Sequence, residues 1–173
     1  MSLTIEWGRR IDNWRNELPR HFYRELGEIA FSGFITTEQL TVQEAAQQQF
    51  APMPPGTPWG AKWEYAWFKG ELTLPESAAG QRIVLCVDLG GESAVYVNGV
   101  AVGARDAQHQ EITLAMQGVP GQRYDIMVEA YAGHGPRVHY AGPTPPGRET
   151  VPEPGPTQAV VGRSTFGIWE EDA

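Results

Sequence analysis

Residues 92–103 read Glu-Ser-Ala-Val-Tyr-Val-Asn-Gly-Val-Ala-Val-Gly, and they follow two shorter apolar segments, 67–75 (Trp-Phe-Lys-Gly-Glu-Leu-Thr-Leu-Pro) and 82–88 (Arg-Ile-Val-Leu-Cys-Val-Asp). Apolar and polar residues alternate within these segments, as they do in strands that bury one face. The dipeptide Asn98-Gly99 suits the positive φ angles of a type I′ hairpin turn. The sequence therefore predicts three consecutive strands, the last of which folds over at this turn.

Turn signals recur along the chain at the spacing typical of an antiparallel sandwich. They separate strand after strand between residues 63 and 131, and they lie at residues 75–80, 90–91, 98–99 and 119–121. The segments 158–161 and 164–169 have strand-like composition again, so one strand is expected to return to the sheet. We therefore predict a mostly β chain built around an antiparallel β-sandwich.

The chain divides into three parts by composition. Residues 1–58 are expected to form an N-terminal helical segment with a connecting strand and a short helix. Residues 59–135 are expected to form the core of the sandwich. Residues 136–173 combine a Pro/Gly-rich stretch, which is expected to run extended over the surface, with the returning strand.

Apolar residues at three- and four-residue intervals predict a helix over residues 8–30, interrupted near Pro19. These residues are Ile11, Trp14, Leu18, Phe22, Leu26 and Ile29. Residues 34–40 are expected to form a strand. Thr41-Val-Gln-Glu44 matches a capping box, which predicts the start of a short helix.

Composition excludes several classes of protein. The net charge is −8 and no cluster of Lys or Arg is present, which argues against nucleic-acid binding and against an anionic membrane surface. No segment approaches the roughly 20 apolar residues of a membrane-spanning helix, and the N-terminus lacks the apolar stretch of a signal peptide. We expect a cytoplasmic protein in which the single cysteine, Cys86, is a buried, unreactive thiol.

The ordered set of strands resembles a known accessory domain. The strand that begins at Trp67 and the Val-Tyr-Val-Asn-Gly hairpin at residues 95–99 are similar to the galactose-binding-like β-sandwich, or jelly roll, of many glycoside hydrolases. Together with Ile126-Met-Val-Glu-Ala-Tyr-Ala-Gly-His134 and Phe166-Gly-Ile-Trp-Glu-Glu-Asp172, they look like the N-terminal region of bacterial and cytosolic-type α-mannosidases of glycoside hydrolase family 38. The resemblance covers residues 60–172.

This resemblance implies that catalysis is carried out by another domain. Enzymes of the family are zinc-dependent retaining α-mannosidases, and their metal ligands and nucleophile lie in a separate catalytic domain. The chain is therefore expected to be a non-catalytic domain excised from a longer polypeptide, with no cofactor of its own. Its expected partners are the zinc-bearing catalytic domain of the same polypeptide and, in a homo-oligomer, further copies.

The titratable residues offer few alternatives to this interpretation. His109 and Glu111 have the spacing to share a strand face, but a catalytic zinc needs three protein ligands and an open position. A glycosidase acting alone needs two carboxyl groups flanking the scissile bond. Asp88 and Glu92 could converge across the Gly90-Gly91 turn, and Asp106, Glu111 and Glu129 are the other candidates in the sandwich. A small carboxylate-dependent glycosidase therefore stays open as the least favoured alternative.

Aromatic residues in loops could stack on a sugar, so a free-standing carbohydrate-binding module is the second alternative. Trp63, Tyr65 and Trp67 are expected to share the core face of one strand. Trp59, in a Pro/Gly loop, is the expected exposed ring. The candidate residues for contact with carbohydrate or with another domain are Trp59, Glu92, Asp106 and His134. Trp7, Trp59, His134 and Trp169 are expected to mark an exposed surface to which the missing domain would pack.

Overall fold

The computed structural model describes residues 3–17, 22–106, 109, 111–135, 141–148, 155 and 157–170. Along the chain its elements are α1 (Leu3–Glu17), β1 (Tyr23–Glu28), β2 (Ser32–Thr36), α3 (Val42–Ala46), β3 (Ala51–Pro52), β4 (Pro58–Trp59), β5 (Tyr65–Thr73), the 3-10 turn η1 (Glu76–Ala78), β6 (Ile83–Cys86), β7 (Glu92–Val97), β8 (Val100–Arg105), β9 (Glu111–Ala115), β10 (Arg123–Tyr131), β11 (Ala159–Val160) and β12 (Thr165–Trp169).

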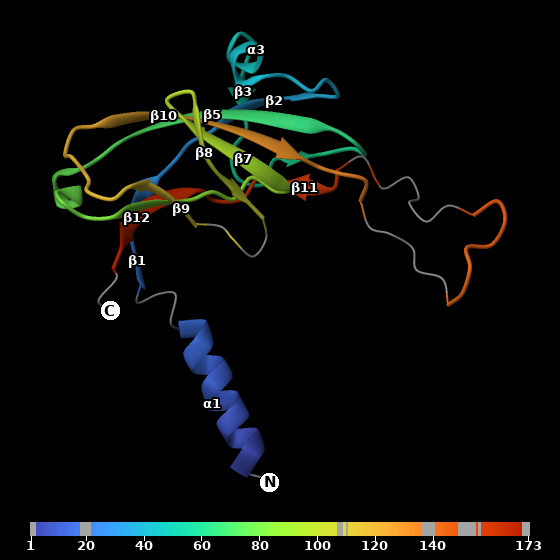
Figure 1. Ribbon diagram of the computed structural model, residues 1–173, viewed down its shortest axis with the longest axis horizontal. Helices are drawn as coiled ribbons and strands as arrows, with labels where there is room; N and C mark the ends of the chain where they lie inside the picture. The colour runs from blue at the N-terminus through green and yellow to red at the C-terminus, as the bar shows by residue number, and fades with distance from the viewer. Residues whose placement is uncertain are drawn as a thin grey trace.

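Two antiparallel sheets lie face to face in Figure 1. One has the strand order β1-β12-β6-β9, the other has the order β3-β2-β5-β10-β7-β8, and β11 and β4 form a separate short pair. Strands from both ends of the chain therefore complete the smaller sheet, and β12 is the predicted returning strand. The prediction of an antiparallel β-sandwich is confirmed.

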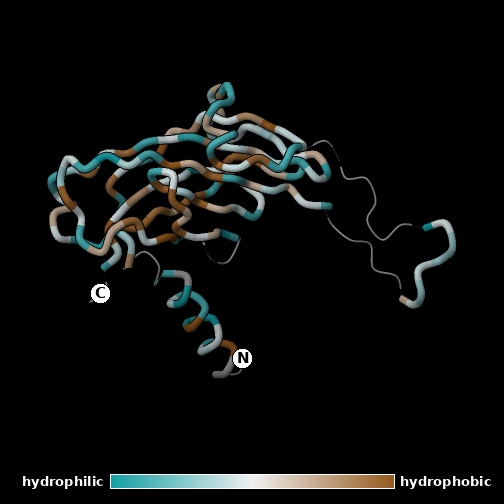
Figure 2. Tube along the Cα trace, turned by 45° about the horizontal axis from the view of Figure 1, so that its top comes forward, coloured by the Kyte–Doolittle hydropathy of each residue, from teal (hydrophilic) through white to brown (hydrophobic). Residues whose placement is uncertain are grey.

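The core lies between the two sheets, where apolar residues gather in Figure 2. Its fully buried members come from facing strands of both sheets, as in other β-sandwiches. They include Phe68, Val95, Ile126 and Val128 from the six-stranded sheet and Leu85 and Ile168 from the four-stranded sheet. Burial of these side chains, at about 25 cal/mol per Å² of apolar surface, is the main stabilising term of the fold.

The hairpin predicted at Asn98-Gly99 is confirmed. Asn98 has a φ of 50° and Gly99 a φ of 81°, and they join β7 to β8. The Asn98 side-chain oxygen accepts a hydrogen bond of 3.0 Å from the backbone N–H of Asp125, so the turn is also tied to β10. The capping box is confirmed too, because the Thr41 and Glu44 side chains each accept a hydrogen bond from the other residue's backbone N–H.

The prediction of a helix over residues 8–30 is wrong in its second half. Residues 23–28 form β1, which pairs with β12. A β-bulge between Glu25 and Gly27 shifts the register, so the apolar spacing does not show the strict alternation of a strand. Leu26 packs against the core and Ile29 is buried in it. Leu18 and Pro19 lie outside the described residues. The strand expected at 34–40 is β2 (Ser32–Thr36), which begins two residues earlier and ends four residues earlier.

Helix α1 stands away from the sandwich in Figure 1. Trp7, Ile11 and Trp14 follow one another at four- and three-residue intervals, which places them on one face of the helix. Their exposed fractions are 59%, 59% and 67%. Within the described part of the chain, no helix is long and apolar enough to cross a membrane.

The aromatic row at the start of β5 faces the opposite way from the prediction. Ala66 and Phe68 belong to the core between the sheets, so Trp67 lies on the outer face, where it stacks on Tyr96. Trp63 precedes the strand, has a φ of 68° and is 49% exposed. The prediction that Trp63, Tyr65 and Trp67 face the core between the sheets is therefore wrong, although Trp67 itself is fully buried, at 0% exposed.

Candidate functional site

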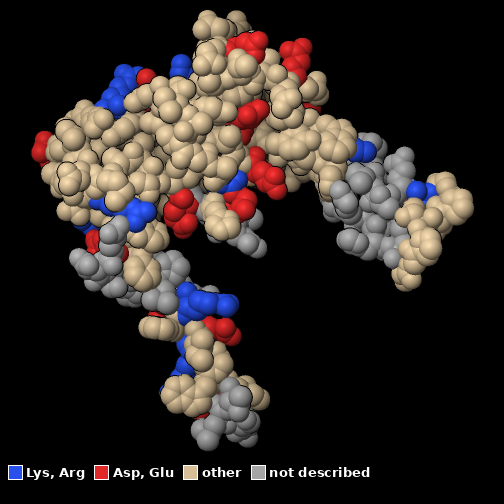
Figure 3. Space-filling model, viewed as in Figure 1, with Lys and Arg blue, Asp and Glu red and all other residues tan. Residues whose placement is uncertain are grey.

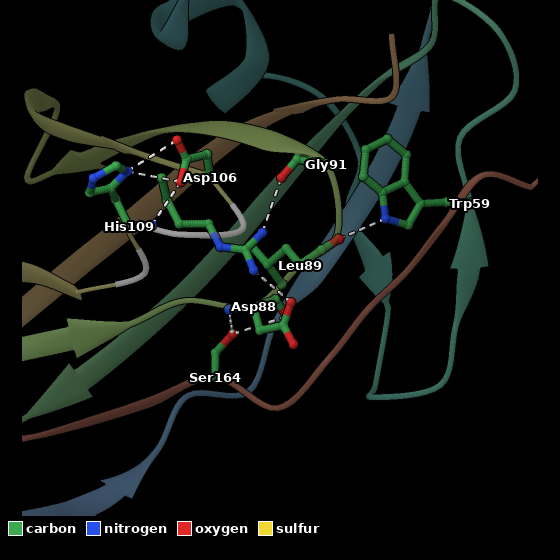
Figure 4. A network of polar contacts seen from close by, with 8 residues as sticks. Trp59, Asp88, Leu89, Gly91, Asp106, His109 and Ser164 are labelled. Carbon is green, nitrogen blue, oxygen red and sulfur yellow. Dashed lines mark hydrogen bonds and ion pairs between the residues drawn. The ribbon is translucent and has the colours of Figure 1, made fainter. Parts of the chain in front are cut away.

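The loop between β6 and β7 is held by side chains from three other parts of the chain (Figure 4). The Arg105 guanidinium donates to the Asp88 carboxylate at 2.9 Å and to the Gly91 carbonyl at 3.0 Å. The Ser164 hydroxyl accepts from the Asp88 N–H at 3.0 Å. Only 5% of the Arg105 side chain is exposed. This network fixes the backbone that leads directly into Glu92.

Trp59 supports the same loop from inside. Its ring is 1% exposed, and its Nε1–H donates to the Leu89 carbonyl at 2.8 Å. The prediction of an exposed Trp59 ring is therefore wrong. The ring packs edge-on against Phe68, and β4 pairs with β11 in such a way that Trp59 lies opposite Ala159. A loop-like Pro/Gly context did not reveal this pairing.

Three of the predicted contact residues meet at one end of the six-stranded sheet. Glu92 begins β7 and Asp106 follows β8, while His134 follows β10 and touches the exposed Trp63 ring edge-on, with centroids 5.9 Å apart. These three, with Tyr131, line a surface hollow. The structure thus brings Glu92, Asp106 and His134 together and leaves Trp59 beneath them.

At this end of the sheet, the Asp106 side chain contacts His109, three residues later in the chain. The Asp106 carboxylate accepts a hydrogen bond of 2.7 Å from the His109 backbone N–H and lies 3.1 Å from its ring Nδ1. The His109 side chain is 78% exposed. Because Nδ1 is engaged by the carboxylate, Nε2 is the ring nitrogen that is left to face a ligand or another surface.

The outer face of the same sheet carries a ladder of cross-strand pairs. One row joins Tyr65 on β5 to Tyr131 on β10 and Tyr131 to Glu92 on β7. The two tyrosine rings stack with centroids 4.7 Å apart. Such aromatic cross-strand pairs stabilise a sheet and leave an apolar surface beside it.

The neighbouring row contains a half-buried carboxylate. Glu129 on β10 lies between Trp67 on β5 and Ala94 on β7, and Ala94 is paired in turn with Ala104 on β8. Burial raises the pKa of Glu129, and its charge helps burial to raise the pKa of Tyr96. No ion-pair partner of Glu129 lies among the described residues.

The two rows enclose a hollow of about 530 Å³. Its aromatic wall is Tyr65 and Tyr131, and its carboxylates are Glu92, Asp106 and Glu129. We call this the outer-face hollow. Acidic side chains gather over the region of β7, β8 and β10 in Figure 3, with little basic surface between them.

A second hollow at the far end of the same sheet differs in charge. It is lined by Lys69, Glu71, Arg123 and Asp125, among others. Arg123 pairs there with both Glu71 and Asp125. Both carboxylates are therefore paired with Arg123, whereas the carboxylate of Glu129 in the outer-face hollow has no cationic partner among the described residues.

The predicted carboxylate pair, Asp88 and Glu92, does not line a common hollow: Glu92 lines both hollows at this end of the sheet and Asp88 lines neither. Asp88 is committed to Arg105, so it does not line the outer-face hollow with Glu92. Among the described residues, no group of three or more His, Cys, Asp or Glu is placed to hold a metal ion. The described residues therefore offer no set of three protein ligands for a catalytic zinc. Cys86 is half-buried rather than fully buried, and burial raises the pKa of its thiol.

Several residues of the site escaped the sequence argument. The Tyr65–Tyr131 pair depends on strand register, which no local pattern specifies. Arg105 ends β8, and nothing in its local sequence indicates that its guanidinium is buried. In the segment before β5, Trp63 rather than Trp59 is the exposed tryptophan. Glu64, the next residue, could have indicated the turn around Trp63. Its carboxylate accepts a hydrogen bond of 2.7 Å from the Ala61 N–H and so closes this turn.

The stacked antiparallel sheets define a jelly-roll β-sandwich. A family model described as "Alpha-mannosidase, jelly roll domain" matches residues 28–150, and the chain belongs to this family. Human α-mannosidase 2C1 is 35% identical over 92 residues, which are 53% of this chain and 9% of that protein. Mouse α-mannosidase 2C1 is 39% identical over 74 residues, which are 43% of this chain and 7% of that protein. The matched segment thus spans less than a tenth of these curated relatives.

Solved structures show the same architecture at low sequence identity. A β-glucuronidase from Ruminococcus gnavus, in complex with N1-substituted uronic isofagomine, superposes with a TM-score of 0.59 at 12% identity. The match covers 87% of this chain and 30% of that one. The apo structure of the same enzyme gives a TM-score of 0.57. These likenesses bear on the fold alone.

Proposed function

We propose that the chain is a non-catalytic accessory domain that packs on and supports the catalytic region of an α-mannosidase-like glycoside hydrolase. The observation that carries this proposal is the match of the α-mannosidase jelly-roll family to residues 28–150. The whole enzyme would hydrolyse terminal α-mannosides. Zinc would be held by the catalytic region, because the described residues of this chain offer no ligand set for it.

Exposed apolar surface supports a packing role. Helix α1 presents Trp7, Ile11 and Trp14 to solvent, and a contiguous apolar stripe of this kind is typical of a surface that another element covers. Trp63 is exposed beside His134 at the end of the sheet. Trp169, by contrast, is half-buried and stacks on Phe22, so it contributes less than expected to such a surface.

The proposal includes a cellular location and a set of partners. We place it in the cytoplasm, because its single cysteine leaves no intrachain disulfide to form. The stripe on α1 is also suited to contact with a second copy, which would make the enzyme a homo-oligomer. Neither nucleic acid nor a membrane is proposed as a partner, since the net charge is −8.

The chain alone should not hydrolyse aryl α-mannosides, with or without added zinc or cobalt, because Asp88 is engaged by Arg105 and no ligand set is present among the described residues. Release of a chromogenic phenol from the purified chain measures this. Turnover that survives repurification and disappears in Glu92→Gln, but not in the exposed control Glu71→Gln, would contradict the non-catalytic assignment.

A free-standing carbohydrate-binding module is the second candidate function. The outer-face hollow is the observation that favours it, because aromatic and carboxylate side chains line the same depression. The two candidates differ in what is bound: an accessory domain must contact a catalytic region, whereas a free module needs only the sugar.

A further inference from the structure

We propose that the outer-face hollow is a binding site for a neutral hexopyranoside. The hollow lies on the outer face of the six-stranded sheet, so sugar binding there is a different role from packing on a catalytic region. The inference holds whether or not the chain supports such a region. The hollow has three parts: an aromatic wall, a polar floor and an acidic rim.

The wall is the stacked pair Tyr65 and Tyr131. Both rings are half-buried, so the sheet fixes them while part of each remains open to the hollow. The C–H-rich face of a pyranose is apolar and packs against aromatic rings, and rigid tyrosines supply contact area at little cost in conformational entropy.

The floor is Glu129 with Ala94 and Ala104. The two alanines are paired across β7 and β8, and their small side chains create the depth of the hollow beside the longer carboxylate. Because Glu129 is half-buried without a cationic partner among the described residues, its hydrogen-bonding capacity is available. A sugar hydroxyl donating to it would form a charge-assisted hydrogen bond in a partly desolvated place, where such bonds are strongest.

The rim adds planar polar groups. Glu92 and Asp106 are acceptors, and the Nε2 of the exposed, neutral His109 ring, whose Nδ1–H is directed at the Asp106 carboxylate, is a further acceptor for a sugar hydroxyl. Small-ligand sites typically combine an apolar wall with a few such convergent groups, in volumes of about 300–1,000 Å³. The 530 Å³ of this hollow lies in that range.

Charge decides the class of sugar. Glu92, Asp106 and Glu129 all line the hollow, and its one arginine, Arg105, is engaged with Asp88 and Gly91. An anionic sugar would meet repulsion that no free guanidinium offsets. A neutral hexopyranoside, whose hydroxyls donate hydrogen bonds to carboxylates, fits this charge.

The test is an amide-shift NMR titration of the chain with methyl α-D-mannopyranoside and methyl β-D-glucopyranoside, each to about 50 mM, well above the millimolar Kd expected of a shallow site. We expect saturable shifts confined to the amides around Tyr65, Glu92 and Tyr131. Methyl β-D-glucuronide, the anionic probe, should bind at least several-fold more weakly.

Two variants locate the site. Glu129→Gln should weaken binding about tenfold or more, because it removes a charged acceptor, while Glu71→Gln, on the same face outside the hollow, should bind like the unchanged chain. Ala104→Leu fills the floor without removing a polar group, so it tests the site even where Glu129→Gln is poorly folded.

Three results would overturn the proposal. They are the absence of a saturable response to either neutral glycoside, an unchanged affinity in both Glu129→Gln and Ala104→Leu, and equal affinity for the glucuronide. None of them bears on whether the chain packs on a catalytic region, which a separate mixing experiment decides.

Discussion

Replacing Trp59 with alanine should lower the free energy of unfolding by about 3–5 kcal/mol, the range for removing a large aromatic side chain from a core. The ring is 1% exposed, and its loss also leaves the Leu89 carbonyl without its 2.8 Å donor. The expected result is a much lower denaturation midpoint in urea with an unchanged slope.

Trp63 provides the matched control for this experiment. It is also a tryptophan in the segment before β5, but it is 49% exposed, so Trp63→Ala should cost less than about 1 kcal/mol. Equal losses in the two variants would contradict the burial that the structure assigns to Trp59.

Replacing Arg105 with alanine should cost about 2–3 kcal/mol, because it removes a guanidinium that is 5% exposed and its hydrogen bonds to the Gly91 carbonyl and to the Asp88 carboxylate, which is itself 47% exposed. The guanidinium holds both Asp88 and the Gly91 carbonyl, so the loop leading into Glu92 should also loosen. Urea denaturation measures the first effect, and faster hydrogen exchange at the amides of Gly90 to Glu92 measures the second.

Arg123 is the control for this variant. It makes two ion pairs, with Glu71 and Asp125, but its side chain is 62% exposed. Exposed pairs contribute about 0–1 kcal/mol, so Arg123→Ala should have a small effect. A loss for Arg123→Ala as large as that for Arg105→Ala would show that burial is not what makes the Arg105 network important.

The features that the sequence predicted correctly are those with local causes. Asn98-Gly99 carries its own preference for positive φ, and Thr41 and Glu44 satisfy each other's backbone within one turn of helix. Their geometry needs no knowledge of the rest of the fold. The same holds for the alternating strands, because their period is visible within a few residues.

The features that could not be predicted from the sequence depend on partners that are distant in the chain. Trp59 is buried because β4 pairs with β11, about a hundred residues later in the chain. The bulge near Gly27 hides the alternation of β1, which forms only against β12. For the site, Glu92, Asp106 and His134 were identified from loop positions, whereas the Tyr65–Tyr131 wall and the place of Glu129 between Trp67 and Ala94 follow from the register of three strands.

The central claim, that the chain supports a catalytic region, is tested most directly by assembling the enzyme from parts. The gene product without residues 1–173 would be purified, and its hydrolysis of an aryl α-mannoside measured alone and after addition of this chain. We predict that the remainder is impaired and that the chain, itself inactive, restores its activity and co-elutes with it. A remainder that is fully active and does not bind the chain would contradict the claim.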